Sequence, residues 1–298
     1  MRKIFTIVSV GISLYAAAQT ELVFVFFKDK PNKAAFYSNP LSELTQKSLN
    51  RRTNLGITLT DQDAPIEPTY IQNIKNLGFT VTDYSKWLNG VAVNATSAQI
   101  AQLSQQSYVD HVESFVRNPS GGIRKEKIDK FKQFNQQSTS RDILTTFNYG
   151  NSLAQTNQIN LRQLHVAGYT GTGMSIAVID TGFPYVNTGS AFKRMRDNGH
   201  IKATYNFVTK SSSVYTTSLN PHGAMCLGII GGYIDGTFVG SAPDADFYLY
   251  ASENADVEIP EEQLYWIEAA EEADRQGVDV ISTSLGYSEF DDSRYDYT

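Results

Sequence analysis

Three apolar runs in the second half of the chain constrain the fold most. They are "MSIAVID" (174–180), "ADFYLYA" (245–251) and "VDVISTSLG" (278–286). A strand that is apolar on both faces is typical of a parallel sheet covered by helices on both sides. Helical patterns over 223–234 and 261–277 separate the runs. We therefore predict an α/β domain over residues 146–298, built on a doubly wound parallel sheet.

Residues 20–116 mix strand and helix signals on a smaller scale. Leu88-Asn89-Gly90 predicts a hairpin turn, because Asn and Gly both tolerate a positive φ. Thr96 and Gln99 have the spacing of a capping box at the start of a helix. Apolar strand-like runs open and close the segment. These signals predict a small ferredoxin-like α+β domain, with helices on one antiparallel sheet.

The two remaining segments have other compositions. Residues 1–19 begin with Arg2 and Lys3, continue with an apolar run and end on small residues, which predicts a secretory signal peptide. The apolar run is too short to span about 30 Å of hydrocarbon. Residues 117–145 are polar, basic and rich in Gln and Ser, so we expect an exposed linker that contains a processing site. The mature chain is therefore expected to be secreted and extracellular.

Charge and cysteine content exclude two classes of protein. Residues 143–298 carry 8 basic and 19 acidic side chains, an imbalance that argues against a nucleic-acid partner. The chain has one cysteine, Cys226, so it forms no internal disulfide. No apolar stretch after residue 19 reaches 18 residues, and we expect no membrane contact after signal cleavage.

An aspartate and a histidine stand where an α/β sheet collects functional groups. Asp180 ends the first apolar run, and open α/β sheets bind ligands outside the carboxyl ends of their strands. His222 opens an apolar helix, where a nearby ionised aspartate would orient its ring and stabilise its charge, as in a nucleophile–base–acid triad. Taken alone, Asp180 is equally well a solvated acid after a strand. The other three histidines have no comparable context: His111, His165 and His200.

Other sites are less well supported by the sequence. Zinc ligands usually come in close pairs such as His-x-x-x-His, which the chain lacks, so we predict no metal site. Gly171-Thr172-Gly173 precedes a strand rather than following one, which argues against a phosphate-binding loop. Cys226 lies one helical turn after His222, so a Cys–His dyad and plain core packing are both open, and the apolar helix favours packing. Four aspartates show no calcium-loop pattern, although structural calcium stays open: Asp244, Asp246, Asp291 and Asp292.

Three motifs resemble those of one enzyme family. "SIAVIDTGF", "PHGAMCLGIIGG" and "DVISTSLGY" are similar to the aspartate, histidine and substrate-strand motifs of the subtilisin-like serine peptidases, in the same order. The resemblance implies that Asp180 is the triad acid and His222 the general base. It also places Ser284, Leu285 and Gly286 on the strand that pairs with extended peptide or protein substrates. Residues 20–116 resemble the family's propeptide, which contacts the catalytic domain, assists its folding and inhibits it.

The sequence departs from the family pattern in two places. Ala224 stands where the family usually has a threonine, and no Gly-Thr-Ser motif for the nucleophile occurs. We therefore expect the nucleophilic serine and the oxyanion asparagine to lie beyond Thr298, in an endopeptidase precursor of which this chain is an inactive N-terminal fragment. The resemblance implies no cofactor. The alternative is a non-catalytic secreted peptide-binding protein on the same scaffold.

Overall fold

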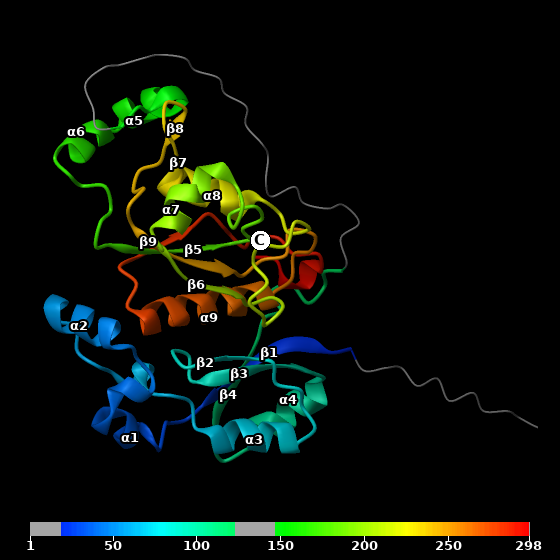
Figure 1. The fold of residues 1–298 in the computed structure, drawn as a ribbon. Coiled ribbons are helices and arrows are strands. Elements are labelled where there is room, and N and C mark those ends of the chain that lie inside the picture. The colour runs from blue at the N-terminus through cyan, green and yellow to red at the C-terminus, as the bar shows by residue number, and fades with distance from the viewer. Residues whose placement is uncertain (1–18, 123–146, 298) are drawn as a thin grey trace, which may run out of the picture.

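A computed structural model describes residues 19–122 and 147–297. The first range forms the N-terminal domain and the second forms the C-terminal domain, and the two are stacked on each other (Figure 1). The signal peptide prediction and most of the predicted linker fall outside these ranges. No helix within them is both long enough and apolar enough to cross a membrane.

The N-terminal domain is built on a four-stranded antiparallel sheet in the order β2-β3-β1-β4. This is the strand order of a ferredoxin-like sheet, as predicted, and helices α3 and α4 cover one face (Figure 1). The turn before β3 has Asn89 at φ 54°, and Thr96 and Gln99 form the predicted capping box of α4. The elements are β1 (Glu21–Phe27), α3 (Pro68–Asn76), β2 (Asp83–Ser85), β3 (Gly90–Ala95), α4 (Ser97–Ser104) and β4 (Val109–Ser114).

An insertion of residues 28–67 separates β1 from α3 and has a small core of its own. Phe36, Leu44 and Ala64 are buried together in it. Its longest helix ends at Gly56, where φ is 67°. The helix begins at Gln46, because the Thr45 side chain caps it there. The elements of the insertion are α1 (Lys33–Ser38), η1 (Pro40–Ser42), α2 (Gln46–Leu55) and η2 (Asp61–Asp63).

The C-terminal domain contains a parallel sheet in the order β10-β5-β9-β6. Helices α7 and α8 cover one face and α9 covers the other, which confirms the doubly wound arrangement (Figure 1). Strand β6 was not predicted, because its sequence has no continuous apolar run. The main elements are β5 (Ser175–Asp180), α7 (Lys193–Asp197), β6 (Ile201–Asn206), α8 (His222–Gly231), β9 (Asp246–Ala251), α9 (Glu261–Gln276) and β10 (Val280–Thr283).

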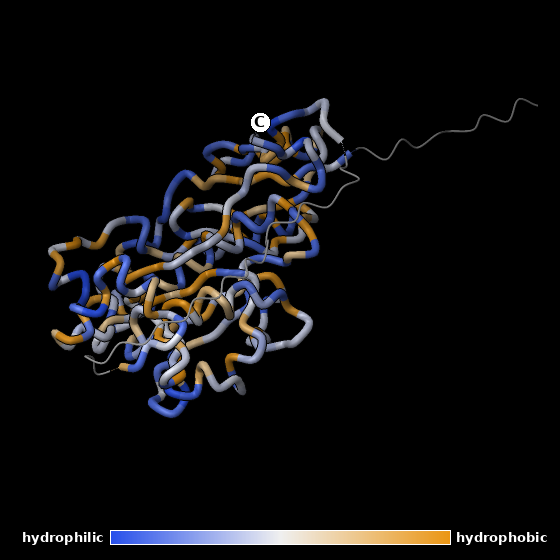
Figure 2. The backbone as a smooth tube through the Cα atoms, turned by 90° about the horizontal axis from the view of Figure 1, so that it is seen from above, coloured by the Kyte–Doolittle hydropathy of each residue, from blue (hydrophilic) through white to orange (hydrophobic). Residues whose placement is uncertain are grey.

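Smaller elements lie at the periphery of this domain, and its two inner strands carry the core. Val178 and Ile179 of β5 and Phe247 and Leu249 of β9 are at most 1% exposed. Figure 2 shows apolar stretches of chain, in orange, separated by hydrophilic ones, in blue. The peripheral elements are η3 (Gly150–Ser152), α5 (Leu153–Gln158), α6 (Leu161–Val166), η4 (Ser190–Phe192), β7 (Tyr233–Ile234), β8 (Phe238–Val239) and η5 (Ser293–Tyr295).

Strand β10 differs from the prediction of a buried strand over 278–286. It covers only Val280–Thr283 and lies at the edge of the described sheet, with β5 as its neighbour. Val280 is 49% exposed and Ile281 is 39% exposed. An apolar run therefore indicated a strand correctly, but it did not show whether both faces of that strand would be covered.

The N-terminal sheet packs its second face against the C-terminal domain. Leu22, Phe24 and Ala92 from the sheet share a core with Leu264 of α9 and Tyr295. Polar contacts also join the two domains, and several of them go to carboxylates on α9. The two domains are therefore joined by a mixed apolar and polar interface along one face of α9.

Candidate active site

Asp180 is the last residue of β5 and is completely buried. Its Oδ1 accepts a hydrogen bond of 2.8 Å from the backbone N–H of Thr181. The Thr181 hydroxyl lies 3.2 Å from the same oxygen and 3.1 Å from the carbonyl oxygen of Asn220. A buried carboxylate needs such donors to stay charged. The strand end and the turn after it thus hold the acid in one orientation.

His222 is the first residue of α8, and its ring points back to Asp180. Its Nδ1 lies 2.7 Å from Asp180 Oδ1, and its side chain is 20% exposed. An ionised carboxylate only accepts hydrogen bonds, so this contact places a proton on Nδ1 and leaves Nε2 as the basic nitrogen. The Asn220 side chain accepts a 2.9 Å hydrogen bond from the His222 backbone N–H and fixes the helix start. The acid–base pair predicted from the sequence is therefore brought together.

A glycine after the histidine permits this close approach. A Cβ on Gly223 would lie 2.4 Å from the Gly182 carbonyl oxygen and 2.9 Å from Asp180 Cβ. Such distances are incompatible with normal packing, so α8 can reach the end of β5 only with glycine here. The Gly223 N–H also donates to the Thr181 hydroxyl at 3.4 Å. Ala224 follows and is buried in the core of the domain.

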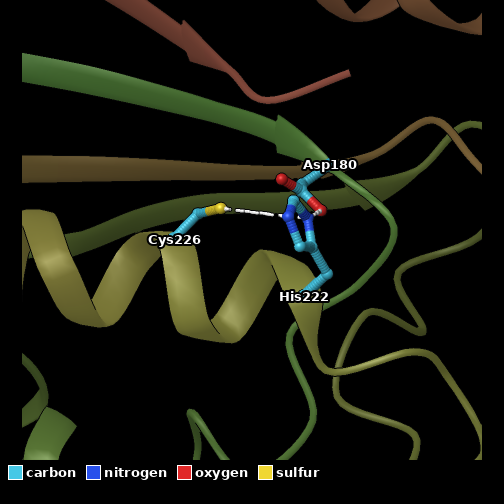
Figure 3. Close-up of side chains that lie close together, drawn as sticks. All are labelled: Asp180, His222 and Cys226. Carbon is cyan, nitrogen blue, oxygen red and sulfur yellow. Dashed lines mark hydrogen bonds and ion pairs between the residues drawn. The ribbon is translucent and has the colours of Figure 1, made fainter. Parts of the chain in front are cut away.

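Cys226 faces the histidine ring from the next turn of α8 (Figure 3). Its Sγ lies 3.8 Å from both ring nitrogens of His222. Burial raises the pKa of the Cys226 thiol, a hydrogen bond with Ser284 opposes this shift, and the charge of Asp180 adds to it. Reactive cysteines have a lowered pKa instead. Cys226 also packs against the apolar core, so the structure favours the packing interpretation over a dyad in which sulfur is the nucleophile.

Asp180, His222 and Cys226 also form a group of potential metal ligands. In the described ranges they bring three ligand atoms within 4.8 Å of one another. Asp180 and His222 are already hydrogen-bonded to each other through Oδ1 and Nδ1. The geometry therefore fits an acid–base pair better than a metal centre.

Ser284, Leu285 and Gly286 follow the end of β10. Thr283 pairs in register with Ile179, the residue before Asp180, so the three residues leave the sheet beside the acid–base pair. Ser284 and Gly286 are exposed and Leu285 is half-buried. They are not part of a strand, and their predicted contact with substrate stays a prediction. The other histidines lie elsewhere: His165 is buried against Tyr149, while His111 and His200 pair with aspartates near the surface.

Comparison with sequence families identifies both domains. Residues 171–297 match the subtilase family, and residues 22–133 match the peptidase S8 propeptide domain of Bacteroidota. The C-terminal domain is a subtilase domain. The N-terminal domain, which precedes it in the chain, is a peptidase S8 propeptide domain. No curated protein matches the chain.

Two solved structures of one protease share the fold of this chain. The epidermin leader peptide processing serine protease (EpiP) of Staphylococcus aureus is 14% identical to this subtilase chain, with a TM-score of 0.54 over 90% of the chain. A mutant of the same protease gives 15% identity, a TM-score of 0.53 and the same coverage. Fervidolysin from Fervidobacterium pennivorans, a keratinolytic enzyme related to subtilisin, is 16% identical, with a TM-score of 0.44 over 80% of this chain and 31% of its own. The subtilase chain spans half the length of the two EpiP chains.

The end of the N-terminal domain is bound to the subtilase domain. Arg117 and Asn118 donate backbone hydrogen bonds of 2.7 and 2.8 Å to the Arg294 carbonyl oxygen. Gly122 donates to the Ser293 hydroxyl at 2.8 Å and accepts from the Ser293 N–H at 2.9 Å. These first residues of the predicted linker are therefore held in place, and the rest of the linker lies outside the described residues.

Sequence analysis missed the carboxylates that join the two domains. Glu271 of α9 accepts hydrogen bonds from the Ser85 hydroxyl, the Lys86 N–H and the Trp87 N–H. Glu268 accepts one from the Tyr84 N–H. The spacing of apolar residues along α9 places Glu271 on the apolar side of the helix. An acid on the side that packs into the core needs a hydrogen-bonding partner, and this was the signal in the sequence that could have revealed the contact.

Proposed function

We propose that this chain is the N-terminal part of a secreted subtilisin-like serine endopeptidase precursor, in which Asp180 and His222 are two members of a catalytic triad. The 2.7 Å contact between Asp180 Oδ1 and His222 Nδ1, at the carboxyl end of β5, carries the proposal. The subtilase match and the protease fold of its structural neighbours support it.

The proposed reaction uses a serine supplied from outside residues 1–298. His222 Nε2 takes the hydroxyl proton while the serine oxygen attacks the peptide carbonyl carbon. The tetrahedral intermediate collapses, the C–N bond breaks, and the leaving amine receives that proton from Nε2. Water then hydrolyses the acyl-enzyme by the same route. Asp180 keeps the ring in the correct tautomer and stabilises the imidazolium, and Ser284, Leu285 and Gly286 bind the substrate main chain.

The N-terminal domain acts in this proposal as an intramolecular inhibitor and folding aid. Its sheet covers α9, and its last described residues pair with Ser293 and Arg294. Both contacts keep its C-terminal end close to the subtilase domain. Cleavage within residues 117–145 would then release the subtilase domain from the N-terminal domain.

The test of the triad uses the complete product of the natural gene. We expect it to hydrolyse a casein substrate and to react covalently with a fluorophosphonate probe for activated serines. His222→Ala should abolish both signals, while His200→Ala, which removes a ring paired with Asp246 near the surface, should keep them. Peptide binding without hydrolysis or labelling would instead favour the non-catalytic peptide-binding protein.

The test of export and processing is N-terminal sequencing of the protein recovered from the culture medium. We expect one species that begins near residue 19 and a mature species that begins within residues 117–145. Retention of the protein in the cytoplasm would contradict export, and a mature N-terminus upstream of Val109 would contradict cleavage in the linker.

A further inference from the structure

The insertion in the N-terminal domain contacts the subtilase domain at a place that the ferredoxin-like sheet does not reach. The start of α2 meets the end of α9. Thr45, the N-cap of α2, donates its backbone N–H to the Arg275 carbonyl oxygen at 3.0 Å. Ser48 donates its hydroxyl to the Asp274 carbonyl oxygen at 2.8 Å. The last carbonyls of a helix have no partner within that helix, and α2 supplies one to the Arg275 carbonyl. The Asp274 carbonyl already accepts the Gly277 N–H at 2.9 Å, so the Ser48 hydroxyl is its second donor.

A buried ion pair reinforces this contact. Arg52 Nη2 lies 2.5 Å from Asp274 Oδ2 and 2.7 Å from Asp63 Oδ1. The Arg52 side chain is 10% exposed, and Asp63 of the insertion holds it toward α9. A cation at the C-terminal end of a helix is also favoured by the helix dipole. The guanidinium is therefore oriented within the insertion and aimed at the end of a helix in the other domain.

Shape limits what can occupy the contact. Gly277 ends α9 at φ 72°, and a Cβ there would lie 2.5 Å from the Ser48 backbone nitrogen and 2.7 Å from Ser48 Cα. Those are backbone atoms, which cannot move aside as a flexible side chain does. The surface of α2 thus requires a helix end without a side chain at this position.

We propose that the insertion (28–67) is a second docking element, whose partner is a helix end with an aspartate three residues before its terminal glycine. Asp274 and Gly277 supply this pattern in α9. The insertion then recognises the subtilase domain independently of the sheet contact. This proposal concerns the docking of two domains and does not depend on peptidase activity.

The docking element also reaches the strand that leads to the candidate site. Arg51 Nε lies 3.7 Å from Asp279 Oδ1, just before β10. Asp279 Oδ2 accepts hydrogen bonds from the Ser175 N–H and hydroxyl, at 2.9 and 2.7 Å. Since Ser175 begins β5, this contact fixes the register of β10 beside the strand that ends in Asp180.

Hydrogen–deuterium exchange of the chain beginning at residue 19 tests the proposal through peptides that cover 45–55. Ser48→Ala removes one docking hydrogen bond but raises the intrinsic helix propensity of α2. We expect about fivefold faster exchange in these peptides, since a hydrogen bond contributes about 1 kcal/mol. Slower or unchanged exchange would mean that α2 is held by the insertion's own core, and it would overturn the proposal.

Two changes on the subtilase side have matched controls. Asp274→Ala and Gly277→Ala should each speed exchange in peptides 45–55 about tenfold or more. Gln276→Ala is the control for the first, because the Gln276 side chain donates a hydrogen bond to Glu272 of its own helix. Gly199→Ala is the control for the second, because Gly199 has φ 65° and open space around it. Equal exchange in variants and controls would refute a docking role even if the Ser48 variant behaved as expected.

Discussion

Glu271 gives the strongest prediction about the interface between the two domains. It lies on α9 and is 8% exposed. Its Oε1 accepts from the Ser85 hydroxyl at 2.5 Å and from the Trp87 N–H at 3.1 Å, and its Oε2 accepts from the Lys86 N–H at 3.2 Å. Glu271→Ala would leave the two backbone donors buried without an acceptor. We therefore expect the docked N-terminal domain to lose stability.

The magnitude follows from these three contacts. A buried donor left unsatisfied costs about 1–3 kcal/mol. Burial raises the pKa of Glu271 above its ordinary value, so desolvation of the carboxylate already offsets part of the gain from its hydrogen bonds. The net loss for Glu271→Ala should therefore be about 2–4 kcal/mol. With a urea slope of about 2 kcal/mol per M, the unfolding midpoint should fall by about 1–2 M.

Tryptophan fluorescence during urea unfolding measures this effect directly. The chain has two tryptophans, Trp87 and Trp266, and both pack against the core beneath α9. Glu272→Gln is the matched control, because Glu272 lies on the same helix but bonds to Arg275 and Gln276. We expect the control to change stability by less than about 0.5 kcal/mol. A Glu271→Ala midpoint within that range would refute the assignment of Glu271 as a structural acceptor for the 85–87 turn.

Three further predictions concern pH, packing and thiol reactivity. Burial raises the pKa of the Glu271 carboxyl, so the folded chain keeps the carboxyl proton to a higher pH than the unfolded chain does. The stability of the wild-type chain relative to Glu271→Gln should therefore rise as the pH falls toward 4.5. Urea midpoints of both proteins from pH 7.5 to 4.5 check this, and a constant difference would contradict it. Gly223→Ala should cost about 1–3 kcal/mol in unfolding experiments, whereas Gly228→Ala, whose Cβ would meet only Phe192 Cζ at 3.9 Å, should not destabilise; equal effects would argue against the close approach. The Cys226 thiol should react with iodoacetamide more slowly than free cysteine at pH 7.5, and faster labelling would contradict its raised pKa.

Much of the fold could be predicted because local signals and tertiary structure agree. Asn89 has the positive φ that its hairpin requires, and Thr96 caps α4 as its spacing indicated. The apolar runs that became β5 and β9 are buried inside the sheet. In these places the pattern of side chains already contains the physical reason for the structure.

The parts that were missed depend on contacts between segments far apart in sequence. Strand β6 pairs with β9 although its own side chains alternate weakly, so only the neighbour reveals it. The exposure of Val280 depends on what lies beside β10, which its sequence does not contain. The acceptor role of Glu271 depends on the turn at 85–87, which is about 185 residues away.

In the candidate site, too, some features could be predicted from the sequence and others could not. Asp180 and His222 could be found because each stands at the end of a recognisable element, and a parallel sheet brings such ends to one edge. The sequence does not show that Gly223 packs closely against Gly182. It also does not show the hydrogen bonds that Thr181 and Asn220 make around the pair. The contact between Cys226 and His222 could be predicted only in part. Their spacing places them on one face of a helix, but it does not show which way that face points.

The most direct test of the central claim is the kcat of the complete gene product with Asp180→Asn. An amide at this position keeps the shape of the side chain but removes the charge that orients and stabilises the His222 ring. We expect kcat for peptide hydrolysis to fall about 10⁴-fold, as happens when a triad acid is neutralised. Asp197→Asn, which removes an exposed carboxylate paired with Lys193, should leave kcat unchanged. An Asp180→Asn enzyme with wild-type kcat would contradict the assignment of Asp180 and His222 as a catalytic pair.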